Sequence, residues 1–350
     1  MVIGIHPDKT GQESYSDKFI EFFTQHNIEV KTLDLLSTSA IAQAKACDGV
    51  LWRWLHRPTD KQSAKQILNA IEFHLKIPVF PNSNTAWHYD NKLSQKYIFD
   101  ALQVSAIPTW IFWNKNEALN WLHNAEYPII FKLSGGAGSA NVIKIDNKEQ
   151  GEKTVNKMFQ CGFFPYTENE FKHNSLNAWL RNPKVLKSRL KEALLYFFKK
   201  EYPPLHKSWW KPEFGYAYFQ KFLPNNKFDT RVTVIGKRAF AYRRFNRPDD
   251  FRASGSGNFD VDPKQIDVRC IDLAFRVSRM GKFQSMAYDF IYDEDQNPVI
   301  GEMSYTFVDW MVEKCPGHWD NNLNWVEGNM WPEYAIAEDF VAELRLMQKK

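Results

Sequence analysis

The chain has 350 residues, of which 44% are hydrophobic and 25% are charged, and its formal net charge is +4. This composition excludes a wholly disordered or fibrous chain and is typical of a folded protein of two or three domains. The longest apolar runs fall far short of the about 20 residues that a membrane-spanning helix needs. The net charge is too small to indicate nucleic acid by itself. We therefore expect neither a membrane span nor a nucleic-acid partner.

The N-terminus and the cysteines indicate the compartment. The first residues read as a buried strand, without the basic stretch and apolar core of a secretory signal. The four cysteines are scattered and form no C-x-x-C pair, which argues against a disulfide framework or a zinc site. We expect a cytoplasmic protein. These cysteines are Cys47, Cys161, Cys270 and Cys315.

Residues 1–85 predict a small α/β domain. Short apolar runs alternate with helical segments, a pattern typical of parallel strands joined by crossover helices. Proline and polar residues after Phe80 mark its probable end. The expected strands are Val2–Ile5, Glu29–Leu33, Gly49–Trp54 and Pro78–Phe80, and the expected helices are Ser16–Gln25 and Lys61–Leu75.

Residues 86–350 predict a larger α+β module in three parts. The first, about 90–145, combines helices with three strands, and an irregular insert at about 150–212 holds one expected helix, Val185–Lys200. The third, about 213–350, is rich in β-branched and aromatic residues and predicts an antiparallel sheet. Its expected elements are three antiparallel strands at Phe214–Leu223, Arg231–Ile235 and Arg238–Phe245, a helix at Lys264–Met280, a hairpin of Met286–Tyr292 with Pro298–Met303, and a helix at Pro332–Met347.

The predicted hairpin carries the sharpest chemical signal. A turn at Glu294–Gln296 would set Asp289 beside Glu302, and Ser304 would share the face of Glu302 because side chains alternate along a strand. Two carboxylates and a hydroxyl form an oxygen site suited to Mg²⁺ with phosphate oxygens. The alternative is a pair of ordinary acids in an edge hairpin.

A lysine and a glycine-rich loop form the second signal. Lys132 lies in an apolar strand, where a cation is costly unless an anion meets it. The following segment, from Ser134 to Ala140, consists of small residues whose backbone N–H groups can approach phosphate closely. Its spacing matches neither the G-x-x-x-x-G-K-[ST] nor the G-x-G-x-x-G motif. A plain glycine-rich hairpin turn is the alternative.

A series of arginines forms the third signal. Strand alternation places Arg231 on one face of its strand and either Arg243 or Arg244 on the same face of the next. Guanidinium groups bind phosphate and carboxylate in a bidentate way. The loop from Asp249 to Asn258, which contains Arg252, could close over a substrate. The alternative is a solvated basic face.

Taken in order, these segments resemble the ATP-grasp superfamily of carboxylate–amine ligases, and most of all its ribosomal-protein glutamate ligase and glutathione synthetase branch. The segments that carry the resemblance are Asn91-Lys92 at a helix start, Pro128–Lys132 with SGGAGSANV, FQKFLPNNKFDTRVTVIGKRAFAYRR, DDFRASGSGN and YDFIYDEDQNPVIGEMS. The resemblance implies an ATP-grasp fold, with two α+β subdomains that grip ATP, preceded by the small parallel-sheet domain.

The resemblance also implies roles for individual residues. The family usually has Asn where Ser304 stands and Glu where Lys221 stands, and a serine hydroxyl can also ligate Mg²⁺. The implied roles are ATP phosphate binding for Lys92 and Lys132, with Gly135, Gly136, Ala137, Gly138 and Ser139 as the covering loop; adenine binding for Gln220, Phe222 and Leu223; ribose contact for Asp229; phosphoryl stabilisation for Arg231 and Arg243; substrate carboxylate binding for Arg252; and ligation of two Mg²⁺, or Mn²⁺ in their place, for Asp289, Glu302 and Ser304.

The implied reaction is ligation through an acylphosphate. ATP would phosphorylate a carboxylate, an amine or thiol would attack the acylphosphate, and ADP and phosphate would leave. The implied partners are a small-molecule, peptide or sugar carboxylate and an amine, and a homo-oligomer is compatible with the sequence. Two alternatives stay open, namely a kinase on the same scaffold that phosphorylates a hydroxyl and a non-catalytic nucleotide-binding module.

Overall fold

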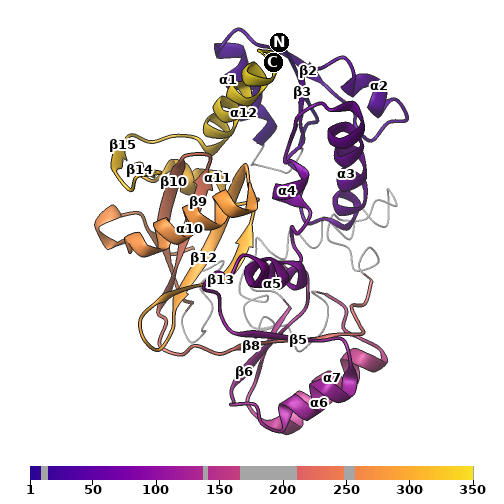
Figure 1. The fold of residues 1–350 in the computed structure, drawn as a ribbon, viewed down its shortest axis with the longest axis vertical. Coiled ribbons are helices and arrows are strands. Elements are labelled where there is room, and N and C mark those ends of the chain that lie inside the picture. Colours follow the sequence, from indigo (N-terminus) through magenta and orange to yellow (C-terminus); the bar gives the residue numbers. More distant parts are fainter. Residues whose placement is uncertain (9–14, 137–140, 166–210, 248–256, 350) are drawn as a thin grey trace, which may run out of the picture. The chain divides into compact units, whose positions relative to one another are not determined.

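The computed structural model comprises two compact units, and Figure 1 labels their helices and strands. Unit 1 comprises Met1–His56, Asp60–Ile107 and Leu223–Lys350, and unit 2 comprises Arg57–Thr59 and Pro108–Phe222. The predicted helix Val185–Lys200 lies outside the described residues. None of the helices in the described part of the chain combines the length and apolar character that a membrane crossing requires. The described residues are 1–8, 15–136, 141–165, 211–247 and 257–349.

The N-terminal part of unit 1 is a four-stranded parallel sheet, as the sequence predicts. Its strand order is β2-β1-β3-β4, and the helix α1 follows β1. Buried Ile3 and Ile5 of β1 pack with the apolar face of α1, which includes Phe19 and Phe23. The elements are β1 (Val2–Ile5), α1 (Tyr15–Gln25), β2 (Glu29–Thr32), α2 (Ala40–Ala44), β3 (Gly49–Leu51), α3 (Pro58–Ala70), the π-helical turn η1 (Ile71–Leu75), β4 (Val79–Phe80) and α4 (Ser83–Ala86).

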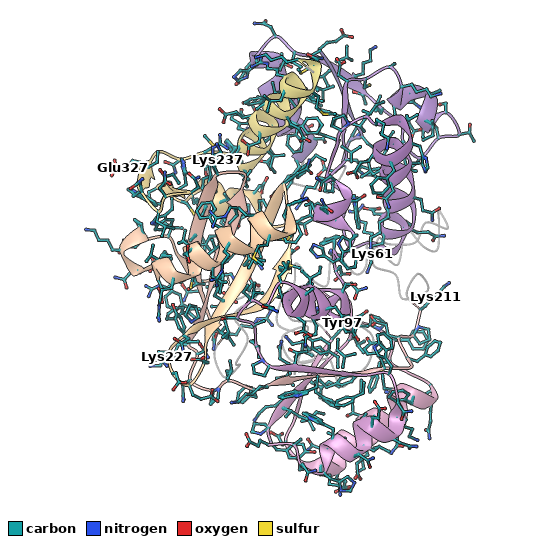
Figure 2. The ribbon with its side chains drawn as sticks, viewed as in Figure 1. Lys61, Tyr97, Lys211, Lys227, Lys237 and Glu327 are labelled. Carbon is teal, nitrogen blue, oxygen red and sulfur yellow. The ribbon has the colours of Figure 1, made fainter. Side chains whose placement is uncertain are left out.

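The second sheet of unit 1 has seven strands in the order β13-β12-β9-β10-β14-β15, with β11 paired to β10. Every described pairing in it is antiparallel. Lys227 lies just before β9 and Lys237 lies in the turn just after it (Figure 2). The elements are β9 (Phe228–Ile235), β10 (Arg238–Phe245), β11 (Phe259–Asp260), η4 (Pro263–Gln265), α10 (Val268–Gly281), β12 (Ser285–Tyr292), β13 (Pro298–Ser304), α11 (Asp309–Glu313), β14 (Gly317–Asp320), β15 (Trp325–Glu327) and α12 (Pro332–Gln348).

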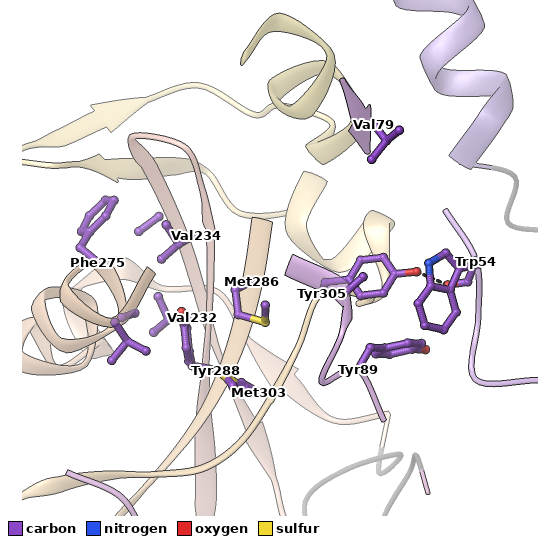
Figure 3. Packing of buried hydrophobic residues seen from close by; sticks show 14 of the residues in the cluster. Trp54, Val79, Tyr89, Val232, Val234, Phe275, Met286, Tyr288, Met303 and Tyr305 are labelled. Atoms are coloured by element: carbon purple, nitrogen blue, oxygen red, sulfur yellow. Dashed lines mark hydrogen bonds between the residues drawn. The ribbon is translucent and has the colours of Figure 1, made fainter. Parts of the chain in front are cut away.

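The two faces of this sheet have different neighbours. On one face, Val232 and Val234 of β9 pack with Phe275 of α10 (Figure 3). On the other face, Tyr242 of β10 belongs to a buried cluster with Phe340 of α12 and with the apolar residues of α1. The two sheets of unit 1 therefore share apolar cores, and the face of β9 opposite α10 is directed toward the inside of this unit.

Unit 2 is built on a four-stranded antiparallel sheet in the order β5-β8-β6-β7. Its apolar face packs against helices, and the Trp121 ring of α6 stacks on Phe219 of β8 at 5.2 Å between centroids. The elements are β5 (Thr109–Phe112), α6 (Lys115–Leu122), β6 (Ile129–Lys132), β7 (Val142–Ile145), α7 (Lys148–Gln160) and β8 (Ala217–Lys221), and in unit 1 α5 (Lys92–Ala101) precedes them.

Two expectations about this region were wrong. The strand predicted at Phe214–Leu223 does not extend the antiparallel sheet of β9 and β10, because β8 pairs with β5 and β6 instead. The prediction paired this strand with β9 and β10 because they follow it closely in the sequence. The helix α7 was not predicted, because its many charged residues conceal the apolar face formed by Val155 and Met158, although Asn147 caps its first turn. The predicted domain boundary near residue 85 falls within unit 1 and stays a prediction.

The helix α12 begins with a buried carboxyl group. Glu333 is fully buried, and within the described part of the chain neither of its carboxylate oxygens has a hydrogen-bond partner. Burial raises the pKa of Glu333 to about 8, since the charged form loses its water without gaining a partner. The side chain is therefore mostly protonated at neutral pH.

This carboxyl group should make stability depend on pH. Its pKa is raised in the folded state, so the folded protein holds the proton more tightly, and stability should fall as pH rises from about 5 through 8. We expect Glu333→Gln to flatten this fall, by on the order of a few kcal/mol at pH 9. Urea unfolding between pH 6 and 9 measures the effect. Glu338→Gln, on the exposed side of the same helix, is the control and should keep the wild-type slope; equal slopes for all three proteins would contradict the assignment.

Candidate functional site

The two predicted carboxylates lie opposite each other in unit 1. Asp289 of β12 pairs in register with Glu302 of β13, which confirms their predicted neighbourhood, and a bulge follows directly after Asp289. Ser304 lies two residues beyond Glu302, and its hydroxyl donates to the backbone carbonyl of Thr306 at 2.8 Å. The bulge changes the local twist of the hairpin at the acid pair.

Two arginines surround Asp289. Arg231, its register partner on β9, binds it in a bidentate way, with Nε 2.7 Å from Oδ1 and Nη2 2.8 Å from Oδ2. Arg244 of β10 binds Asp229 in the same way at 2.7 and 2.6 Å, and its Nη2 lies 2.8 Å from Oδ2 of Asp289. Burial alone would raise the pKa of Asp289, but the two guanidinium groups outweigh it and hold the pKa well below its usual range.

The structure resolves which of the two consecutive arginines shares the face of Arg231. Arg244 pairs with Asp229 and Tyr242 pairs with Arg231, so Arg244 lies on the face of the acid pair. Arg243 lies on the opposite face, where its Nη2 is 2.6 Å from Oδ2 of Asp260. The resemblance gave Arg243 a place beside Arg231; the alternation of the strand gives that place to Arg244 instead.

Lys92 joins the same group of charges. It is the first residue of α5, where the Asn91 side chain caps the helix by accepting from the Ser94 N–H. Lys92 is 5% exposed, and its Nζ lies 3.4 Å from Oε1 of Glu302. One of the two predicted phosphate-binding lysines therefore lies beside the predicted metal ligands.

The chemistry of these donors fits Mg²⁺ in part. Asp289 and Glu302 offer the hard oxygen ligands that Mg²⁺ prefers. The described residues contain no group of three or more His, Cys, Asp or Glu side chains that could hold a metal ion. A Mg²⁺ ion at this pair would therefore need further oxygen ligands, as from phosphate groups and water.

Unit 2 carries the second predicted lysine. The Nζ of Lys132, at the end of β6, donates to Oε1 of Gln220 on β8 at 2.6 Å. The Gln220 amide in turn donates to the Thr109 hydroxyl at 3.2 Å. This polar row lies on the sheet face away from the aromatic residues that pack on α6, and Gln220 is one of the partners that hold the lysine in place.

A carboxylate anchors the start of the glycine-rich loop. Glu213 accepts hydrogen bonds from the Ser134 N–H and hydroxyl at 2.9 and 2.6 Å and from the Gly135 N–H at 3.4 Å. The buried Tyr216 hydroxyl also donates to Glu213, and burial next to this carboxylate raises the pKa of Tyr216. Sequence reasoning missed this anchor, because Glu213 follows the irregular insert and belongs to no recognised motif.

The other predicted residues have different surroundings. Leu223 lies in unit 1, in an apolar cluster with Ile107 and Val299, whereas Phe222 lies in unit 2 under the Lys144 ammonium at 5.3 Å. Gly136 is described and has φ of 130°, a conformation that favours glycine. The remaining predicted site residues lie outside the described residues, namely Ala137, Gly138, Ser139 and Arg252.

Solved structures share the fold of this chain over nearly its whole length. A RimK domain ATP-grasp protein from Sphaerobacter thermophilus matches 98% of this chain and 100% of its own with a TM-score of 0.54 at 12% identity. The chain has the ATP-grasp fold. A D-cycloserine synthetase (TM-score 0.56, 12% identity, 98% and 100% coverage) and a biotin carboxylase from Campylobacter jejuni (0.56, 13%, 96% and 70%) also match. No protein-family model and no curated protein matches the sequence.

The Glu213 anchor can be tested by amide hydrogen exchange. Glu213→Ala removes the acceptor of the Gly135 N–H and one of the two acceptors of the Ser134 N–H, which also donates to the Tyr216 hydroxyl at 2.7 Å, and each bond is worth about 1 kcal/mol. We expect the Gly135 amide to exchange about fivefold faster and the Ser134 amide to change less, while the amides of β6 stay protected. Glu117→Ala, on the exposed side of α6, is the control. Unchanged exchange at both loop amides in the Glu213 variant would contradict the anchor.

Proposed function

We propose that the chain is an ATP- and Mg²⁺-dependent ligase that activates a carboxylate as an acylphosphate. The observation that carries this proposal is the sheet face on which Arg231 and Arg244 lie beside Asp289, where Lys92 at the start of α5 contacts Glu302. Cations that suit phosphate and acids that suit a divalent ion are thus adjacent. A structural neighbour supports it, a biotin carboxylase domain from Hydrogenobacter thermophilus in complex with ADP and magnesium.

Residues of both units have a role in this proposal. Lys92 of unit 1 and Lys132 of unit 2 bind ATP phosphates, and Gln220 and Phe222 of unit 2 contact adenine. Asp289 and Glu302, with Ser304, would hold Mg²⁺, or Mn²⁺ in its place, which supplies charge neutralisation for the phosphates. Arg231 and Arg244 stabilise the negative charge that develops as the phosphoryl group transfers. No nucleophilic side chain is needed, because positioning and charge supply the catalysis.

The bonds change in two steps. A carboxylate oxygen of the substrate attacks the γ-phosphorus, the bond to the bridging oxygen breaks, and ADP leaves. The amine nitrogen (or a thiol) then attacks the acyl carbon, the bond to the phosphate oxygen breaks, and inorganic phosphate leaves as the amine loses a proton. The substrate is a small-molecule, peptide or sugar carboxylate. The four free cysteines fit the reducing cytoplasm that we propose for this reaction.

A screen for ADP release tests the proposal. We expect ADP to form when a carboxylate and an amine are both supplied, and Lys132→Ala and Glu302→Ala to lower the rate at least about 100-fold, because each removes a charge that acts on the transferring group. Lys237→Ala and Glu327→Ala are the matched controls, since Lys237 is exposed in the turn between β9 and β10 and Glu327 is exposed at the end of β15 (Figure 2), and these variants should keep the wild-type rate.

Three outcomes would contradict the ligase. Equal phosphate release with and without the acceptor would leave no role for the amine. A phosphorylated product that survives hydroxylamine would indicate a hydroxyl kinase, because hydroxylamine destroys acylphosphates. Binding of MgATP without turnover over a broad substrate panel would indicate a non-catalytic module.

A further inference from the structure

We propose that Arg244 blocks metal binding at Asp289 until a polyphosphate is bound, so that the metal ion and the nucleotide enter the site together. The inference rests on the proposed function, because it concerns the same acid pair. It goes further in assigning to one arginine the control over when that pair can act as a metal site.

The first step is the occupancy of Asp289. Both of its carboxylate oxygens already accept hydrogen bonds from Arg231, at 2.7 and 2.8 Å, and Oδ2 also accepts from Arg244 at 2.8 Å. These bonds use about three of the four lone-pair sites of the carboxylate, one on Oδ1 and both on Oδ2. Mg²⁺, which ligates oxygen at about 2.0–2.1 Å, can bind Oδ2 only if one of the guanidinium groups leaves it. A metal ion and the two guanidinium groups therefore compete for one carboxylate.

The second step is the charge of the whole set. Three cations and three anions are joined by ion pairs, and their formal charges sum to zero. A divalent ion that approaches without phosphate therefore meets no net negative charge and is repelled by three cations. An ordinary acidic metal site, by contrast, attracts the ion through its net negative charge. We call these residues the ion-pair set: Lys92 with Glu302, Arg231 with Asp289, and Arg244 with both Asp229 and Asp289.

The third step is what a polyphosphate changes. Its oxygens accept hydrogen bonds from guanidinium and ammonium groups, so they compete with the carboxylates for Arg244 and Lys92. A cation that turns toward phosphate leaves a carboxylate oxygen free for the metal, and the phosphate adds negative charge and further oxygen ligands. By linkage, the metal must strengthen phosphate binding by the same factor.

Within the ion-pair set, a substitution of Arg244 gives the most direct test of the inference. Its Nη2 lies between two acids, 2.6 Å from Asp229 and 2.8 Å from Asp289, and it is the sole described link between them. Its loss leaves Arg231 on Asp289 but gives the set a net charge of −1. The preceding residue, Arg243, offers a matched control, because it lies on the other face of β10 and pairs with Asp260.

The experiment measures Mn²⁺ binding to the whole protein by water-proton relaxation, first without nucleotide and then with ADP, since relaxation enhancement distinguishes the ternary complex from Mn-ADP in solution. We expect the wild type to bind Mn²⁺ alone at least tenfold more weakly than with ADP. Arg244→Gln should bind Mn²⁺ alone at least tenfold more tightly than the wild type and show a smaller effect of ADP. Arg243→Gln should behave as the wild type. Thermal unfolding confirms that both variants are folded.

The outcomes separate this inference from the proposed function. If Arg244→Gln binds Mn²⁺ alone no more tightly than the wild type, the inference is overturned, whatever ADP does. If the wild type binds Mn²⁺ equally well with and without ADP, it is also overturned. If ADP fails to bind any of the proteins, the proposed function fails, while the comparison of Mn²⁺ affinities without nucleotide still tests the role of Arg244.

Discussion

Opposite charges on one largely buried sheet face are the constraint on which the rest of the site depends. An unpaired buried charge costs several kcal/mol, and removing one partner of a buried pair is strongly destabilising. Asp229, Asp289, Arg231 and Arg244 meet this constraint by bidentate pairing across β9, β10 and β12. The ion pairs can form because the strand register places each arginine beside a carboxylate. A shift of one residue would move every charged side chain of that strand to the face covered by α10.

The same register explains what could be predicted from the sequence. Asp289 and Glu302 were placed side by side because a short hairpin fixes its own pairing, and the structure confirms their register. Strand alternation alone did not distinguish Arg243 from Arg244, and the resemblance pointed to Arg243; two consecutive residues point to opposite faces, and the choice depends on where β10 pairs with β9. β8 was assigned to the wrong sheet for a related reason: pairing with β5 and β6 joins residues about 90–110 positions apart, and no local pattern records it.

The fold could be predicted from the sequence more readily than the contacts between side chains. The order of motifs from Lys92 to Ser304 predicts the ATP-grasp fold, and structures with 12% and 13% identity share that fold with this chain. The pairing of Lys92 with Glu302 and the anchor at Glu213 were not predicted, because each joins side chains from elements that are remote in sequence. The fold can be predicted from patterns along the chain, whereas the electrostatic state of a site depends on distances between side chains of different elements.

The short apolar cluster of Ile107, Leu223 and Val299 has a consequence for how this chain is assembled. The chain leaves unit 1 after Ile107 and re-enters it at Leu223, and both residues belong to that cluster. Apart from Arg57–Thr59, unit 2 is thus one continuous insertion in the sequence of unit 1, and the residues on both sides of the insertion pack in the same cluster. Evolution can lengthen, shorten or exchange such an insertion with little damage to the host core, since the residues at both junctions pack with Val299 in the host.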